Sequence, residues 1–230
     1  MIKMAMLNKD EILSIGMCLK LSDLLNLSLI NKKYFSILEK IWICKLNKDF
    51  EDFYILNLHS SHKEIYTLLY SLNTLKNKIE LKESIYELYN LETFGFHKGM
   101  ISIPKEIWSL RNLKNLDLSY NSFTEIPKEL SNLRNLVVLS LDSNEITFIP
   151  AEIENLSKLK SLSLSNNKIS VLPEEFSKLS NLEVLYIHGN KFSTAPEQLI
   201  RSPKLNSLYI SVLVSIPFSL IRSNIYIKRL

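Results

Sequence analysis

Five prolines recur at one constant interval and constrain the fold more than any other feature of the chain. Pro104, Pro127, Pro150, Pro173 and Pro196 follow one another at steps of 23 residues. A constant period of this length predicts stacked copies of one supersecondary unit. Each copy then buries its apolar face against its neighbours, so the core is continuous along the stack.

The other positions of the unit follow the same period. One copy, starting at Leu113, reads LKNLDLSYNSFTEIPKELSNLRN. The alternation of Leu116 and Leu118 predicts a short strand with both leucines pointing inward. The proline fits the first position of a short helix, where its missing N–H is not needed. The helix leucines Leu130 and Leu133 lie one turn apart and are expected to close the core.

An asparagine occupies the same position in four successive copies. These residues are Asn121, Asn144, Asn167 and Asn190. An asparagine side chain can bond exposed backbone groups in a turn. Stacking of the copies therefore predicts a ladder of asparagines beside the strands.

The unit resembles the leucine-rich repeat, L-x-x-L-x-L-x-x-N-x-L-x-x-[LI]-P, in its 23-residue intracellular form, over roughly residues 91–230. The resemblance implies an α/β solenoid, a horseshoe of about six repeats with its strands on the concave side. The terminal units depart from the pattern, because the first lacks the asparagine and Pro217 comes two residues early. Atypical end units are expected of such stacks, and residues 225–227 are expected to form a closing strand.

The first 48 residues have a helical period and no repeat. Capping signals at Asn8 and Ser22 predict helix starts, and together the segment predicts a three-helix module. It resembles the F-box, with departures from its consensus at Asn8, Asn31 and Tyr34. The resemblance implies docking to a Skp-type adaptor. The residues expected to bind that adaptor are Leu7, Ile12, Leu13, Ile15, Leu19, Leu24, Leu27, Ile30, Tyr34 and Trp42.

The apolar stripe of this module has a second interpretation. Leu24, Leu27, Ile30 and Tyr34 could instead form a closed core against residues 49–90. Residues 49–90 themselves predict helices, one through Ile65, Leu68, Leu69 and Leu72, and another through Ile79, Leu81, Ile85 and Leu88. We interpret 49–90 as a helical linker and N-terminal cap, between an F-box-like module at 1–48 and the repeats at 91–230.

The sequence offers little support for catalysis or for a cofactor. Its four glycines have no phosphate-binding spacing, and Cys18 and Cys44 cannot build a disulfide framework. His59 and His62 lack the further ligands of a metal site. A net charge of +4 is too small to predict nucleic-acid binding, and no run of about 18 apolar residues predicts a membrane span. We therefore expect no catalytic, metal or cofactor site, and a cytoplasmic location.

Side chains that flank the inward leucines are expected to line the concave face. The middle of that face is small and polar, whereas Tyr186, His188 and Tyr209 are expected to form an aromatic cluster towards its C-terminal end. Tyrosine is favoured at protein interfaces, although covering the strands is the other role open to these residues. The candidate substrate-binding residues are Asp117, Tyr120, Asp142, Tyr186, His188 and Tyr209.

These features together predict a non-catalytic adaptor. The F-box resemblance implies that the chain joins a Skp-type adaptor and a cullin ubiquitin ligase as a monomer within that complex, while the repeats hold a substrate protein. Tethering raises the effective concentration of the substrate near the ligase. In a virus or bacterium the protein would act in the host cytoplasm or nucleus. The alternative is a protein-binding scaffold or signalling regulator without a ubiquitin role.

Overall fold

The computed structural model describes residues 62–79, 85–97 and 99–230. The chain divides into two compact units between Tyr86 and Glu87. The F-box-like module predicted at 1–48, with its adaptor-binding residues from Leu7 to Trp42, lies outside the described residues.

One long helix is described in the first unit. Helix α4 spans His62–Lys78, and its buried side chains recur every three or four residues, as the sequence predicts. They are Ile65, Leu69, Leu72 and Leu75. The assignment of Ile79 to the next helix was wrong, because its N–H donates to the Leu75 carbonyl and continues the hydrogen bonding of α4. The next helix, α5, spans Ile85–Tyr89.

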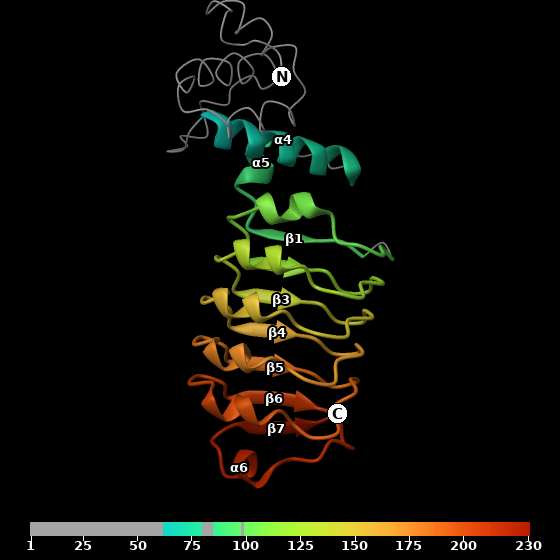
Figure 1. Ribbon diagram of the computed structural model, residues 1–230, viewed down its shortest axis with the longest axis vertical. Coiled ribbons are helices and arrows are strands. Elements are labelled where there is room, and N and C mark those ends of the chain that lie inside the picture. Colours follow the sequence, from blue (N-terminus) through green and yellow to red (C-terminus); the bar gives the residue numbers. More distant parts are fainter. Residues whose placement is uncertain (1–61, 80–84, 98) are drawn as a thin grey trace, which may run out of the picture. The chain divides into compact units, whose positions relative to one another are not determined.

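The second unit is a solenoid of seven parallel strands stacked in chain order (Figure 1). Each strand pairs with the strand one repeat away, so the 23-residue period sets the register. Leu116 thus lies beside Leu139, and Leu139 beside Leu162. The strands are β1 Thr93–Gly95, β2 Asn115–Asp117, β3 Val138–Ser140, β4 Ser161–Ser163, β5 Val184–Tyr186, β6 Ser207–Ile210 and β7 Tyr226–Arg229. The predicted closing strand is confirmed as β7, beginning one residue later than expected.

The core runs through the middle of the stack, between the strands and short helices on the other side. Leu116, Leu118, Leu130 and Leu133 are all at most 2% exposed, as their positions in the unit predict. Burying each such side chain contributes roughly 1.5–3 kcal/mol. Because the successive repeats supply buried apolar side chains at these positions, with Ser202 in place of the last leucine, the core continues from one repeat to the next.

The short helices after the prolines are 3₁₀ helices. They are η4 Lys105–Ser109, η5 Lys128–Asn132, η6 Ala151–Asn155, η7 Glu174–Lys178 and η8 Glu197–Arg201. The sequence analysis expected each proline to be the first residue of the helix. In the structure the proline is instead the N-cap residue, which precedes the helix. Pro127 has extended backbone angles, and its carbonyl accepts the hydrogen bond from the Leu130 N–H. Proline suits this position, because an N-cap residue needs only its carbonyl for the first turn.

The predicted asparagine ladder is present. The Asn144 Nδ2 group donates to the carbonyls of Leu118 and Leu141 at 3.0 and 3.1 Å, and its Oδ1 accepts from the Phe123 N–H at 3.1 Å. The equivalent bonds recur one repeat on at Asn167. Each asparagine thus joins the backbone of neighbouring repeats through a buried side chain.

Candidate functional site

One face of the sheet is lined by the polar and aromatic side chains that alternate with the buried leucines; we call it the strand face. Strand register places its side chains in rows across the repeats. One row comprises Gly95, Asp117, Ser140, Ser163, Tyr186, Tyr209 and Lys228. The next row, just beyond the strand ends, includes Asp142, Ser165 and His188. This is the face on which the sequence analysis placed its candidate binding residues.

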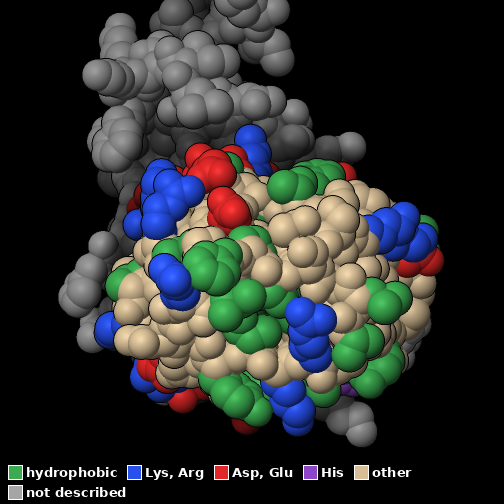
Figure 2. Space-filling model, turned by 90° about the horizontal axis from the view of Figure 1, so that it is seen from below, with side chains coloured by type: hydrophobic (Ala, Val, Ile, Leu, Met, Phe, Trp, Pro, Cys, Tyr) green, Lys and Arg blue, Asp and Glu red, His purple; other side chains and the backbone are tan. Residues whose placement is uncertain are grey.

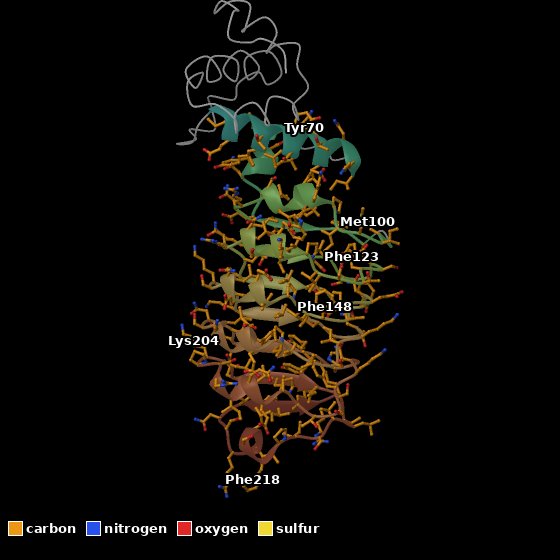
Figure 3. All side chains as sticks on the ribbon, in the orientation of Figure 1. Tyr70, Met100, Phe123, Phe148, Lys204 and Phe218 are labelled. Carbon is orange, nitrogen blue, oxygen red and sulfur yellow. The ribbon has the colours of Figure 1, made fainter. Side chains whose placement is uncertain are left out.

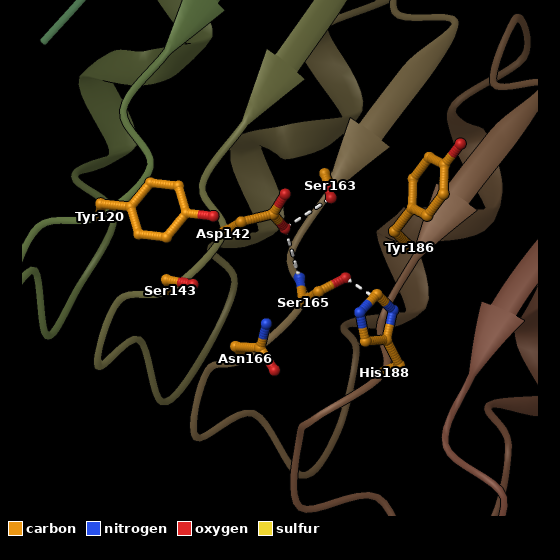
Figure 4. Close-up of a pocket in the computed structure, with 8 residues that line it drawn as sticks. All are labelled: Tyr120, Asp142, Ser143, Ser163, Ser165, Asn166, Tyr186 and His188. Carbon is orange, nitrogen blue, oxygen red and sulfur yellow. Dashed lines mark hydrogen bonds between the residues drawn. The ribbon is translucent and has the colours of Figure 1, made fainter. Parts of the chain in front are cut away.

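A shallow open cavity of about 340 Å³ lies on the strand face between the third and fifth strands (Figure 4). Its lining includes four of the six predicted residues: Tyr120, Asp142, Tyr186 and His188. Ser143, Ser163, Ser165 and Asn166 complete the lining. Asp117 and Tyr209, the other two predicted residues, lie outside it on the row described above.

The Asp142 carboxylate is the fixed centre of this cavity. Its Oδ1 accepts hydrogen bonds from the Ser163 hydroxyl at 2.5 Å and from the Ser165 N–H at 2.8 Å. These donors hold the carboxylate in one orientation, as Figure 4 shows. No lysine or arginine is among the residues that line the cavity. The cavity therefore presents the negative charge of Asp142 without a cationic side chain in its lining.

Two tyrosines form an aromatic surface beside the cavity. The rings of Tyr186 and Tyr209 are stacked, with centroids 4.3 Å apart and an interplanar angle of 16°. Burial raises the pKa of the Tyr186 phenol, and the neighbouring Tyr209 and Asp142 raise it further. Tyr186 therefore stays protonated at neutral pH. The Lys228 ammonium lies 5.9 Å from the Tyr209 ring centroid on the far side of the pair.

His188 does not join this stack, although the sequence analysis grouped it with the two tyrosines. Its Nδ1 lies 3.0 Å from the Ser165 hydroxyl. The Ser165 residue is only 2% exposed, so its hydroxyl is not accessible to attack a substrate. In the described part of the chain no carboxylate is bonded to the other ring nitrogen of His188. The pair therefore lacks the third member and the accessible nucleophile of a catalytic triad.

Asp117 belongs to a second polar cluster, near the start of the solenoid. Its Oδ1 accepts from the Ser119 N–H and hydroxyl, and its Oδ2 lies 3.6 Å from His97 Nε2. The His97 and Tyr120 rings meet edge to face with centroids 6.1 Å apart. Tyr120 therefore connects this cluster to the cavity that it also lines.

The rim of the cavity is held in a strained backbone conformation. Tyr120, Ser143 and Asn166 have φ angles of 56°, 55° and 53°, and Gly189 has the same conformation one repeat on. A residue other than glycine that adopts such a positive φ angle costs roughly 1–3 kcal/mol of conformational energy. Only Gly189 signalled this turn in the sequence. The Tyr120 ring is 69% exposed at the cavity edge.

Three residues of this surface were not among the candidate binding residues of the sequence analysis. Ser163 and Ser165 orient Asp142, but their positions in the repeat pattern did not distinguish them from the other serines of the face. Lys228 was missed because the irregular spacing after Pro217 hid its register with Tyr209. The change from 23 to 21 residues at that proline was the available signal.

The described residues contain no group of three or more His, Cys, Asp and Glu side chains placed to hold a metal ion. Over the same residues, every helix is too short or too polar to cross a bilayer. Nothing in this part of the chain therefore adds a metal centre to the polar and aromatic surface described above.

The fold and its polar strand face define a repeat solenoid of the protein-binding class. A family model described as leucine rich repeat matches residues 102–146, 134–192 and 157–211. The matched part of the chain therefore consists of leucine-rich repeats, as the resemblance implied. Such domains generally serve as non-catalytic scaffolds for protein–protein binding. No curated protein matches the chain.

Several solved structures share this fold. A leucine-rich repeat protein of Leptospira interrogans is 28% identical over 57% of this chain and 40% of its own, with a TM-score of 0.50. The ectodomain of the Arabidopsis thaliana receptor kinase GASSHO1/SCHENGEN3, solved with CASPARIAN STRIP INTEGRITY FACTOR 2, is 28% identical over 61% of this chain and 18% of its own, with a TM-score of 0.53. The chain thus spans less than half the length of either structure.

A more distant likeness shows the fold alone. The Drosophila Toll–Spatzle complex contains a chain that is 21% identical over 57% of this chain and 19% of its own, with a TM-score of 0.52.

Proposed function

We propose that the chain is a non-catalytic adaptor whose strand face binds a protein partner. The stacked pair of Tyr186 and Tyr209 carries this proposal. Aromatic side chains are enriched among the residues that dominate binding energy at protein interfaces. The pair lies beside a fixed carboxylate, so one surface offers an apolar anchor and an acceptor for polar groups. Among the similar structures, the GASSHO1/SCHENGEN3 ectodomain was solved with a bound protein partner.

The openness of the strand face also favours a protein over a small molecule. Small-molecule sites bury most of their ligand in a concave, mainly apolar pocket. The cavity here is shallow and is lined chiefly by polar side chains from three repeats. An extended segment or a domain surface could contact several rows at once, which a small molecule could not do.

We further propose that residues 1–48 dock a Skp-type adaptor and so bring the partner to a cullin ubiquitin ligase. The support is the F-box resemblance of the segment from Leu7 to Trp42. On this proposal the chain performs no chemistry, and ubiquitin transfer takes place elsewhere in the complex. It acts by raising the effective concentration of the partner. A scaffold without a ubiquitin role is the alternative, and it needs only the strand face.

The strand-face proposal predicts that replacing both Tyr186 and Tyr209 by alanine lowers partner capture at least about tenfold, the effect of losing about 1.4 kcal/mol of binding energy. Capture is measured by crosslinking full-length protein in cells and quantifying the crosslinked proteins by mass spectrometry. Phe148→Ala is the matched control, because Phe148 is also aromatic and 50% exposed but lies outside the strand face (Figure 3). Equal capture by the double variant and the wild type would refute this use of the strand face.

The adaptor proposal predicts that the wild-type chain binds a purified Skp-type adaptor, and that Leu24→Asp or Ile30→Asp weakens this binding at least about tenfold. A charged side chain in an apolar interface costs far more than that factor requires. Binding is measured by calorimetry, with Tyr186→Ala plus Tyr209→Ala as the variant that should still bind the adaptor. Failure of the wild type to bind would leave the scaffold alternative, and full binding by both aspartate variants would reject the proposed docking face.

A further inference from the structure

The C-terminal end of the solenoid exposes a cluster of apolar side chains. Leu213 is 94% exposed, and Phe218 and Ile221 of helix α6 (Phe218–Ile221) are 66% and 62% exposed. Tyr226 of β7 is 62% exposed as well. Figure 2 views this end directly and shows hydrophobic side chains gathered there with lysine and arginine side chains between them. Exposed apolar groups that cluster in this way mark interaction surfaces.

The last segment of the chain is also basic. Residues 198–230 contain no Asp or Glu, and their charged residues are Arg201, Lys204, Arg222, Lys228 and Arg229. The charge therefore belongs to one end of the molecule, although the net charge of the whole chain is only +4.

Several cations elsewhere in the solenoid pair with a carboxylate of the neighbouring repeat, whereas Lys158 and Lys204 bond to an asparagine of the preceding repeat. Lys168 pairs with Glu145 at 2.8 Å, Lys178 with Glu154 at 2.6 Å, and Arg201 with Glu174 at 2.7 Å. These bonds all point back to the preceding repeat.

The three cations of the last unit have no such partner. Within the described residues, no carboxylate pairs with Arg222, Lys228 or Arg229. Arg222 lies over the Phe218 ring, Lys228 lies near the Tyr209 ring, and Arg229 donates to the Val212 carbonyl. These three exposed cations are therefore available to pair with carboxylates of a partner.

The backbone of β7 offers a second point of attachment. The N–H groups of Tyr226 and Leu230 donate to the carbonyls of Asn206 and Ile210, on the β6 side. In a parallel sheet, the backbone groups of successive residues in one strand hydrogen-bond alternately to the strand on one side and to the strand on the other. The peptide groups of Ile227 and Arg229 therefore point to the outer edge of the sheet, where β7 is the last described strand.

We propose that β7 binds an extended acidic segment of a partner protein as an added strand. The backbone of the segment would pair with Ile227 and Arg229, as in other cases of strand addition. Its carboxylates would pair with Arg222, Lys228 and Arg229, and its apolar side chains would cover the exposed residues of α6. An anionic membrane matches the charge and the apolar groups, but a lipid surface cannot satisfy the free backbone groups of an edge strand.

The proposal predicts that a fluorescein-labelled eight-residue peptide of alternating Val and Glu binds the full chain with a dissociation constant below about 1 mM. Binding is measured by fluorescence anisotropy at low salt. The same peptide with Lys in place of Glu is expected to bind at least about tenfold more weakly, because it meets like charges. Absence of saturable binding by the Glu peptide, or equal binding of the two peptides, would overturn the proposal.

Charge variants locate the site. Arg222→Glu combined with Lys228→Glu is expected to weaken binding of the Glu peptide at least about tenfold. Lys128→Glu is the matched control, because Lys128 is an exposed lysine of η5, several repeats from β7. The dissociation constant of the Glu peptide for the Lys128→Glu variant should stay within about twofold of its value for the wild type. A loss as large in Lys128→Glu as in the paired variant would place the site elsewhere.

A proline variant tests whether the peptide adds as a strand. Arg229→Gln removes the charge, whereas Arg229→Pro also removes the outward N–H. Binding by the proline variant is expected to be severalfold weaker than binding by the glutamine variant, with equal circular dichroism spectra as the check on folding. Equal binding would reject strand addition. Binding to phosphatidylserine vesicles without binding of the Glu peptide would assign the surface to a membrane and overturn the proposal.

Discussion

Replacing Leu162 by alanine is expected to lower the free energy of unfolding of the repeat unit by about 3 kcal/mol, within the range for buried leucines. Leu162 is 0% exposed in β4, with Leu139 and Leu185 as its partners in the adjacent strands. Backbone pairing on both sides keeps the strands from moving together to fill the space left by the lost leucine side chain. The loss is measured by guanidinium unfolding of the full chain, followed by circular dichroism.

A charged side chain at the same position is expected to lower the free energy of unfolding further. Leu162→Asp buries a carboxylate with no partner, at a cost of several kcal/mol beyond the lost leucine. We expect this variant to lack the folded repeats altogether. Ser161→Asp is the matched control, because Ser161 lies next to Leu162 in β4 and is only half-buried. It should keep its unfolding midpoint close to that of the wild type, and a comparable loss in the two aspartate variants would contradict the assigned core.

The strand register could be predicted from the sequence because one period sets several columns at once. Leucines 23 residues apart must pair if the proline and asparagine positions also align, and the structure pairs Leu139 with Leu162 as expected. The period says nothing about hydrogen bonding within the short helix. The placement of each proline as an N-cap, and the 3₁₀ form of the helix, therefore became visible only in the structure.

The sequence predicted which side chains of the candidate site share a row, but it did not predict which of them are in contact. Tyr186 and Tyr209 occupy the same row on adjacent strands, about 4.8 Å apart, and so can stack. His188 lies two residues further along its strand direction, about 6.8 Å away from the row, and turns to Ser165 instead. The sequence shows which side chains share a face, whereas the choice between such partners depends on distances within that face.

Irregular spacing of the repeats limited the prediction of strand register most at the C-terminal end. The period failed after Pro217, so the sequence could place a closing strand but not its register. That register brings Lys228 beside Tyr209 and makes β7 the last strand of the sheet among the described residues. The proposed strand-addition surface thus lies in a part of the solenoid where the repeat pattern breaks.

Replacing Asn144 by alanine is expected to lower the free energy of unfolding by about 3 kcal/mol, since it leaves several buried backbone groups without their partner. The side chain is 7% exposed and bonds to the carbonyls of Leu118 and Leu141 and to the N–H of Phe123. Unfolding in guanidinium, followed by circular dichroism, measures the loss.

Two further variants separate the contribution of the hydrogen bonds from that of the residue type. Asn144→Asp keeps an acceptor for the Phe123 N–H but faces the Leu118 and Leu141 carbonyls with oxygen instead of a donor, so we expect a loss at least as large as with alanine. Asn135→Ala is the surface control. Asn135 is half-buried, and the hydrogen bond from its Nδ2 group to the Arg111 carbonyl at 2.9 Å is exposed to solvent, so its loss should stay within about 0.5 kcal/mol. Equal losses at Asn135 and Asn144 would mean that the ladder is no stronger than ordinary surface hydrogen bonding, and that apolar burial alone holds the repeats together.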